Sequence, residues 1–312
     1  MPTPGLEHLK KRRWLSISSL NTAARCPRLF FYKSGIRLRG GGRSAPLVFG
    51  EAVHAAAPWS LQGETDKAME EFDKAWDDSL DDKAHSRENA RRMLEDFWHT
   101  HSGGKGLYEI MNPPQGLIDM GEKKSPFEIP FAIDIGLPIP LVGFIDWLGQ
   151  YRDRDMVIPV DLKTTSELSD RVFSSFQRNP QICAYILAVR YITGDDKVDR
   201  MIIEFMRKSG AKQQAVETIS QVFQVTEDDL ADFIEWARYW GTQILAWEET
   251  GEFPKNINAC TPYPSFGSHG YICDCHTLCM VRDWTMMLDS YEIGEERDFA
   301  LDLLPTLETV EE

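Results

Sequence analysis

Four short motifs follow one another along the chain, and each carries side chains that can take part in chemistry. In chain order they are Gly50-x-x-x-His54, Gly143-x-x-Asp146, Asp161-x-Lys163 and Gln181-x-x-x-Tyr185. Together they supply carboxylates, an imidazole and a lysine, the set of groups that metal-dependent phosphodiester cleavage requires. The motifs therefore point to a nuclease.

Each of the two aspartates follows an apolar run that is typical of a β-strand. Asp146 comes directly after residues 141–145, and Asp161 comes directly after residues 157–160. If the two strands pair as a hairpin, both aspartates meet at one end of it and can hold Mg²⁺ or Mn²⁺ through oxygen. Lys163 lies two residues beyond Asp161 and faces the same side of the strand. There it can orient or help deprotonate a water, and it can offset negative charge in the transition state.

The other two motifs place polar side chains on helices. His54 would add a nitrogen ligand, which suits Mn²⁺ better than Ca²⁺. Gln181 and Tyr185 are four residues apart on one predicted helix and share a face, where they can hold the DNA backbone or the lysine. Taken alone, an aspartate at a strand end is commonly structural and a lone histidine is commonly a core residue. The conjunction of the motifs favours a site.

The elements that must position these groups can be read from the hydrophobic pattern. Short runs rich in Ile, Val and Phe predict strands over 127–133, 141–148, 156–162 and 201–206, with a weaker candidate over 216–225. Asn179 as N-cap and Pro180 at the first helical position predict a helix that ends before Gly194. Further helices are expected from a cap at Ser19 or Asn21 to Tyr32, from about Leu47, over 64–99, and from Thr226 to Gly251. The order predicts an α/β fold with a mixed central sheet flanked by helices, an N-terminal helical part and a C-terminal Cys-rich loop.

The motifs and their order resemble the RecB-like branch of the PD-(D/E)XK nucleases, which includes CRISPR-associated and phage exonucleases. The opening segment from Ser16 to Leu20 and from Arg25 to Tyr32 is also similar to the start of that family, and the resemblance covers about residues 14–284. It implies a PD-(D/E)XK nuclease core with Lys163 as the catalytic lysine and with Gln181 and Tyr185 as accessory residues. It implies metal ligation by the side chains of His54, Asp146 and Asp161 and by the Leu162 carbonyl. Glu122 or Glu128 is a candidate for a further acidic member.

Six cysteines are present, in a compartment that we expect to be reducing. Thiolates favour iron–sulfur clusters or zinc, and spacing alone does not decide between them. The resemblance implies a [4Fe–4S] cluster that joins the two ends of the chain through Cys26, Cys260, Cys273 and Cys279. Cys275 can replace Cys273 as a ligand. Free thiols and zinc remain alternatives.

Charge is distributed unevenly and helps to divide the chain. The net charge is −15, yet residues 1–43 hold ten Lys or Arg and one acid, whereas residues 283–312 hold ten acids and one Arg. We expect five segments: a basic arm with Cys26 (1–43), a helical part with His54 (44–125), the nuclease core and a C-terminal helix (126–258), a Cys-rich segment (259–285) and an acidic tail (286–312). Only the arm suits phosphates, through residues 10–13 and Arg25, Arg28, Arg37 and Arg39.

Several function classes are disfavoured. No apolar run approaches the roughly 20 residues that span a bilayer, and the first residues lack the apolar stretch of a signal peptide, so we expect a cytoplasmic protein with no membrane partner. No Gly-x-x-x-x-Gly-Lys-Ser/Thr motif occurs, so unwinding of DNA would need a partner helicase.

The function expected from these residues is a Mg²⁺- or Mn²⁺-dependent DNA exonuclease acting on single-stranded ends. The processes that it would serve are recombination, repair, replication or CRISPR adaptation. One alternative is a nuclease-fold subunit of a DNA-processing assembly that cuts little by itself. Another is a zinc-binding interaction module, which requires the acidic residues to be incidental.

Overall fold

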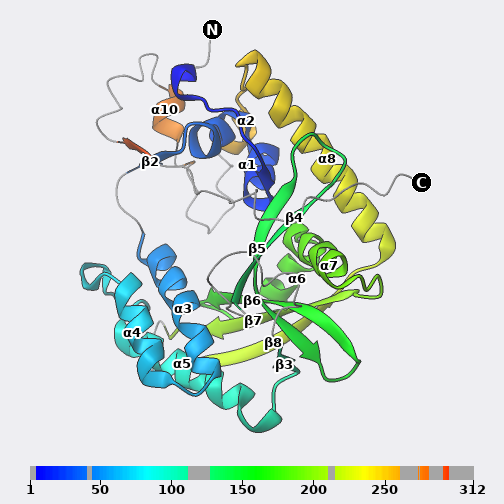
Figure 1. Ribbon diagram of the computed structural model, residues 1–312. Helices are drawn as coiled ribbons and strands as arrows, with labels where there is room; N and C mark the ends of the chain where they lie inside the picture. The colour runs from blue at the N-terminus through cyan, green and yellow to red at the C-terminus, as the bar shows by residue number, and fades with distance from the viewer. Residues whose placement is uncertain are drawn as a thin grey trace. The chain divides into compact units, whose positions relative to one another are not determined.

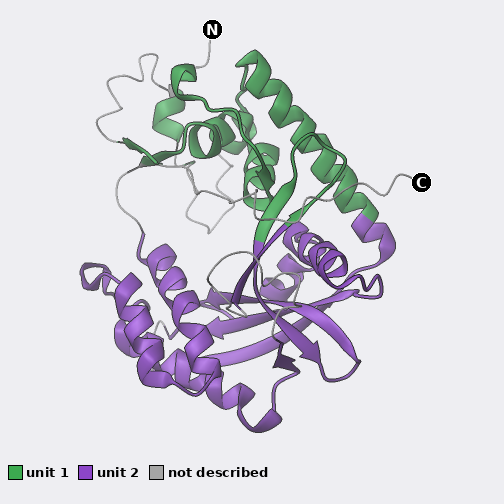
Figure 2. Cartoon of the chain, viewed as in Figure 1, with its two compact units in different colours: residues 1–42, 132–143, 231–312 green, residues 43–131, 144–230 purple. Residues whose placement is uncertain are grey.

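The computed structural model describes residues 5–40, 44–111, 127–209, 215–260, 273, 275–280 and 291–294. The chain divides into two compact units, which Figure 2 distinguishes by colour. Unit 1 consists of residues 1–42, 132–143 and 231–312, and unit 2 consists of residues 43–131 and 144–230.

The sheet is mixed, as the sequence predicts. Its strands are β1 (Leu15–Ser16), β3 (Tyr108–Ile110), β4 (Phe127–Ile133), β5 (Leu141–Tyr151), β6 (Met156–Thr165), β7 (Arg200–Arg207) and β8 (Glu217–Gln224). The strand order is β1-β5-β6-β7-β8, and β3 and β4 also pair with β5. β6 pairs with β5 in antiparallel and with β7 in parallel orientation, and β8 is antiparallel to β7.

Helices cover both faces of the sheet in unit 2 (Figure 1). They are α3 (Ala45–Leu61), α4 (Thr65–Ala75), α5 (Arg87–His101), α6 (Asp170–Phe176) and α7 (Pro180–Thr193), with short 3₁₀ turns η3 (Asp78–Leu80) and η4 (Ser102–Gly104). α3 packs on α4 and α5, α5 packs on β7 and β8, and α7 packs on β6 and β7. The inner residues of β7 are all buried, which is the pattern of a strand covered on both faces.

Local sequence explains where the site-bearing elements begin and end. The Asn179 side chain accepts a hydrogen bond from Gln181 N at 2.9 Å, Pro180 starts α7, and Gly194 with φ 68° ends it. The strands of the hairpin are longer than predicted, because β5 continues to Tyr151 and β6 to Thr165. The predicted ends at residues 148 and 162 were therefore wrong by three residues each.

Unit 1 is built from short elements and most of one long helix. Its elements are η1 (Leu6–His8), β1, α1 (Ile17–Arg25), α2 (Pro27–Phe30), the π-helical turn η2 (Phe31–Gly35), β2 (Leu38–Gly40), α8 (Glu227–Thr250, which starts in unit 2), α9 (Ile257–Cys260), α10 (His276–Met280) and β9 (Tyr291–Ile293). β1 pairs in parallel with the first residues of β5, and β2 pairs in antiparallel orientation with β9. Among the helices that the structure describes, none combines the length and apolar character needed to cross a membrane.

Aromatic side chains form the core of unit 1. Phe30, Phe31 and Tyr32 are almost fully buried, and the rings of Phe30 and Phe31 lie 6.3 and 4.7 Å from that of Phe253. They therefore anchor the N-terminal segment and do not present a surface on which bases could stack. The cap of α1 was predicted wrongly: Ser16 is the N-cap, in a reciprocal capping box with Ser19.

Candidate active site

The polar side chains of the four motifs all lie in unit 2, on elements that meet near the middle of the sheet. His54 is on α3, Asp146 on β5, Asp161, Leu162 and Lys163 on β6, and Gln181 and Tyr185 on α7. The predicted hairpin is present, so segments far apart in sequence bring these groups together.

The two aspartates lie where the hydrogen-bonded ladder of the hairpin stops. Trp147 and Val160 are the last register partners of β5 and β6 on this side. Two residues beyond Val160, Leu162 N donates to Asp146 Oδ2 at 2.7 Å. A carboxylate thus takes the place of a ladder carbonyl, which fixes the Asp146 side chain beside the backbone of β6.

Asp161 is the most buried charged group of the site. Its residue is 1% exposed, and Lys163 Nζ lies 2.6 Å from its Oδ2 atom. Apart from this ion pair, Oδ2 has no hydrogen-bond partner among the described residues. A buried carboxylate oxygen held only by an ion pair is energetically unfavourable.

α3 brings its histidine to the other aspartate. His54 Nδ1 lies 3.4 Å from Asp146 Oδ2. Gly50, one turn earlier on α3, packs against β6, where a Cβ atom built on it would lie 3.6 Å from Thr164 Oγ1. That spacing is ordinary van der Waals contact, so the absence of a side chain at Gly50 is not needed to bring α3 to the strand.

α7 supports Asp161 from its first turns. Gln181 Nε2 donates to Asp161 Oδ1 at 3.2 Å and to the Tyr185 hydroxyl at 2.8 Å. The Phe131 ring lies edge-on to that of Tyr185. The pKa of Tyr185 is raised well above its usual range by burial and then by Asp161 and Asp146. Tyr185 therefore stays protonated, and Gln181 orients the buried carboxylate.

Burial and proximity shift the pKa values of two ionisable groups of the site. Burial and then the nearby Asp161 raise the pKa of Asp146 to about 6, whereas His54 and Lys163 act to lower it. Burial opposes the charge on Lys163, but Asp161 and Asp146 outweigh it and raise the pKa of the Lys163 ammonium. Lys163 is therefore a cation at neutral pH.

The donor atoms suit a hard or borderline divalent cation. Carboxylates from β5 and β6, an imidazole from α3 and the buried, unsatisfied Asp161 Oδ2 are the chemistry that Mg²⁺ or Mn²⁺ accepts. In the part of the chain that the structure describes, no three His, Cys, Asp or Glu side chains are grouped closely enough to hold a metal ion as they stand. A metal ion would therefore need these side chains to move closer together.

The candidates for a further acidic ligand are not brought into this set. Glu128 is exposed on β4 with a left-handed backbone at φ 53°. Glu122 lies outside the described residues.

A second buried carboxylate, on the neighbouring strand, was not anticipated from the sequence. Glu204 on β7 is fully buried. Both of its carboxylate oxygens accept a hydrogen bond from the Ser220 hydroxyl at 2.9 Å, and Oε1 lies 3.1 Å from His101 Nε2. Burial opposes protonation of His101, but Glu204 outweighs it and raises the pKa of His101. The three groups come from α5, β7 and β8, so no local signal in the sequence could have found them.

The cysteines proposed as cluster ligands all lie in unit 1. Burial raises the pKa of the Cys260 thiol, with Cys26 and Cys273 as the next causes. Burial also raises the pKa of the Cys279 thiol to about 11, and Cys260 and Cys26 add to it. None of the six cysteines, all within the described residues, forms a disulfide. The four thiols therefore lie near enough to influence one another, although no three of them are grouped tightly enough to bind a metal ion as they stand.

Comparisons with known proteins agree with this fold. A family model described as the PD-(D/E)XK nuclease superfamily matches residues 14–280. A solved structure described as a "putative exonuclease" from Eubacterium rectale aligns with a TM-score of 0.51 and 14% sequence identity, over 87% of this chain and 90% of that one. At that identity the likeness shows the fold alone. No curated protein matches the chain.

Proposed function

The chain belongs to the PD-(D/E)XK nuclease superfamily, and from this premise we propose that it is a metal-dependent deoxyribonuclease whose active site is centred on Asp146 and Asp161. The observation that carries the proposal is the state of Asp161, which is 1% exposed, lies 2.6 Å from Lys163 Nζ and leaves one oxygen without a hydrogen bond. A purely structural carboxylate in such a place would be satisfied by neighbouring donors.

The ion that we propose is Mg²⁺ or Mn²⁺, held by the side chains of His54, Asp146 and Asp161 and by the carbonyl of Leu162. When bound, it supplies a Lewis acid for the scissile phosphate and for the attacking water. The side chain of Gln181 fixes the orientation of Asp161 through its hydrogen bond to Oδ1. Tyr185 fixes Gln181 in turn by accepting a hydrogen bond from the same amide.

Lys163 acts by charge in this proposal. Its raised pKa keeps the ammonium protonated, so it is better suited to offset the charge that develops on the phosphate than to remove a proton from water. Burial strengthens that effect, because charges interact more strongly where water is excluded.

The substrate that we propose is DNA, cleaved from single-stranded ends in recombination, repair, replication or CRISPR adaptation. The protein described as a "putative exonuclease" shares this fold, and the exonuclease mode that we propose follows its description. A helicase or an adaptation complex is the partner class that this activity would serve.

We also propose that Cys26, Cys260, Cys273 and Cys279 hold a [4Fe–4S] cluster that joins the ends of the chain in unit 1. Cys26 and Cys273 contribute to the raised pKa of Cys260, and Cys260 and Cys26 contribute to that of Cys279; this proximity supports the cluster, and thiolates are the ligands that such clusters use. Cys275 is the alternative to Cys273. Protein purified without oxygen should be brown and contain iron and sulfide, and Cys279→Ser should lose both before cleavage is affected. Colourless, iron-free wild-type protein would reject the cluster.

The nuclease proposal is tested by degradation of end-labelled single- and double-stranded DNA with Mg²⁺ or Mn²⁺. Wild type should release label only with metal, and Asp161→Ala should not release it. Asp155→Ala is the matched control, because this aspartate is in the same hairpin but contacts only Gln150 among the interactions described. Full activity of Asp161→Ala would reject the site. An inactive, cluster-loaded wild type would favour an assembly subunit that needs its partner.

A further inference from the structure

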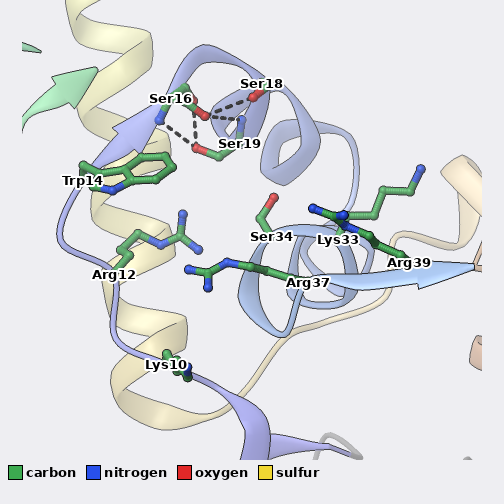
Figure 3. A pocket seen from close by; sticks show the side chains of 10 residues that line it. All are labelled: Lys10, Arg12, Trp14, Ser16, Ser18, Ser19, Lys33, Ser34, Arg37 and Arg39. Carbon is green, nitrogen blue, oxygen red and sulfur yellow. Dashed lines mark hydrogen bonds between the residues drawn. The ribbon is translucent and has the colours of Figure 1, made fainter. Parts of the chain in front are cut away.

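A cavity of about 250 Å³ in unit 1 is lined almost entirely by basic and hydroxyl side chains. Figure 3 shows its lining residues, which are Lys10, Arg12, Trp14, Ser16, Ser18, Ser19, Lys33, Ser34, Arg37 and Arg39. None of them is acidic, although the whole chain carries a net charge of −15. We propose that this basic pocket binds phosphate groups of a single DNA strand, an inference that rests on the proposed function for the identity of the ligand.

The N-terminal segment presents every second residue to the pocket. Lys10, Arg12, Trp14 and Ser16 line it, whereas Lys11 and Arg13 between them do not. Alternation with a period of two is the geometry of an extended chain, which puts successive side chains on opposite sides. The basic run thus divides into a half that faces the pocket and a half that does not.

The pocket gathers five cationic side chains within one small volume. Arg12 is ion-paired with Glu248 and lies 4.4 Å above the Phe30 ring, which fixes its side chain. Glu292 is the register partner of Arg39 across β2 and β9. Lys10, Lys33 and Arg37 add three further cations to the lining. A cavity that gathers like charges attracts an anion with several negative groups.

The backbone at Arg37 indicates that its side chain has a function. Arg37 adopts φ 55°, in the left-handed region where glycine is least strained. Gly294 N donates to the Arg37 carbonyl at 2.9 Å and holds this conformation. In Figure 3 the guanidinium groups of Arg12 and Arg37 extend from different segments toward the same space. Strained backbone conformations of this kind cluster at binding and active sites of proteins.

Several features favour a single polynucleotide strand as the ligand. The volume is slightly below the about 300–1,000 Å³ of pockets for drug-sized ligands, which suits a nucleotide-sized segment. Trp14 adds an aromatic ring to the cationic lining, and the combination of cations and aromatic rings is how proteins hold single strands without reading sequence. The phosphate can be internal to the strand or at its end.

The test is fluorescence anisotropy of labelled single-stranded DNA bound to the full chain, with a chelator present to prevent cleavage. Arg37→Gly removes the cation and relaxes the backbone, so it should fold as wild type by thermal melting. Arg37→Gly and Lys10→Gln should each weaken binding about three- to tenfold and reduce the slope of log affinity against log salt by about 0.7. Lys11→Gln is the matched control and should change neither quantity.

The outcomes distinguish a terminal from an internal phosphate, and they distinguish failure of the pocket proposal from failure of the nuclease proposal. Oligonucleotides with a 5′-hydroxyl, a 5′-phosphate or a 3′-phosphate distinguish a terminal from an internal phosphate, since a terminal site confines the Arg37→Gly effect to one of the phosphorylated ends. The inference would be overturned, even if cleavage is normal, if Arg37→Gly and Lys10→Gln bind DNA with the same affinity and salt slope as Lys11→Gln. Binding sensitive to Arg37→Gly in a chain that never cleaves DNA would support the pocket and reject the nuclease proposal.

Discussion

Two buried carboxylates on neighbouring strands of unit 2 have opposite environments. Leu162 on β6 is the register partner of Glu204 on β7, so Asp161 and Glu204 belong to adjacent positions of the same parallel pair. Glu204 is fully satisfied, with the Ser220 hydroxyl at 2.9 Å and His101 Nε2 at 3.1 Å. Asp161 has Lys163 at 2.6 Å and an oxygen without a hydrogen bond.

This difference separates a structural carboxylate from a functional one. A buried network whose hydrogen bonds are all satisfied stabilises the fold and leaves no carboxylate oxygen available to a ligand. An ion pair with an unsatisfied oxygen contributes less to stability, because the desolvation of both charges is repaid only in part. We infer that Glu204 holds α5, β7 and β8 together and that Asp161 is kept for metal and substrate.

The largest effect expected from this comparison is on catalysis. Lys163→Gln removes the cation that compensates Asp161, and the cleavage rate should fall about 10²–10³-fold, since a preorganised charge at the reacting group is lost. Metal binding should be retained, because the ammonium competes with the ion for Asp161. A multiple-turnover cleavage assay at saturating Mn²⁺ measures this. A rate within a factor of two of wild type would show that Lys163 only balances charge in the resting fold.

The largest effect expected on stability is at Glu204. Glu204→Ala leaves His101 and Ser220 without their partner in a buried site and should lower the free energy of unfolding by about 3–5 kcal/mol. Urea denaturation measures it, with Asp161→Ala as the matched variant on the next strand. Asp161→Ala should be clearly less destabilising. Equal losses for the two variants would contradict the distinction between them.

A pH effect follows from Asp146, whose pKa burial and Asp161 raise to about 6. Metal ligation needs the carboxylate, so the Mn²⁺ concentration for half-maximal cleavage should rise about tenfold per pH unit below 6 and be flat above it. The folded pKa exceeds the ordinary value of 3.8, so the metal-free fold binds this proton more tightly than the unfolded chain. This carboxyl therefore adds stability as the pH falls through 6. A Mn²⁺ requirement unchanged between pH 7 and 5 would exclude it as a ligand.

The smallest effect expected is at Ser220. Ser220→Ala removes the hydroxyl that donates a hydrogen bond to Glu204 but leaves His101 in place. The free energy of unfolding should therefore fall by about 1–3 kcal/mol. Cleavage per folded molecule should not change. A loss of cleavage with an intact fold would indicate that this network reaches the active site.

Sequence alone predicts the features of this molecule that depend on local pattern. The Asn179 cap and Pro180 start of α7, the β5–β6 hairpin and the mixed sheet are confirmed, because caps and alternation act over a few residues. The Ser16 cap was missed, since a reciprocal box closed by Ser19 lacks the usual acidic partner. β3 was missed because it is a three-residue strand after a glycine-rich stretch.

Long-range features could not be predicted from local pattern. His101 and Glu204 are 103 residues apart, and the sequence near either residue does not predict contact with the other. The four motifs predicted which side chains gather at the site. They did not show that Asp161 lacks a hydrogen bond at one oxygen, because burial and satisfaction depend on how β5, β6 and α7 pack.

The measurement that tests the central claim most directly is a calorimetric titration of Mn²⁺ into wild type, Asp161→Ala and Glu204→Gln. Wild type and Glu204→Gln should bind the ion with similar affinity, and Asp161→Ala should show no binding at the site. Unchanged binding by Asp161→Ala, or loss of binding by a folded Glu204→Gln, would contradict the assignment of metal ligation to Asp161 and of structure to Glu204.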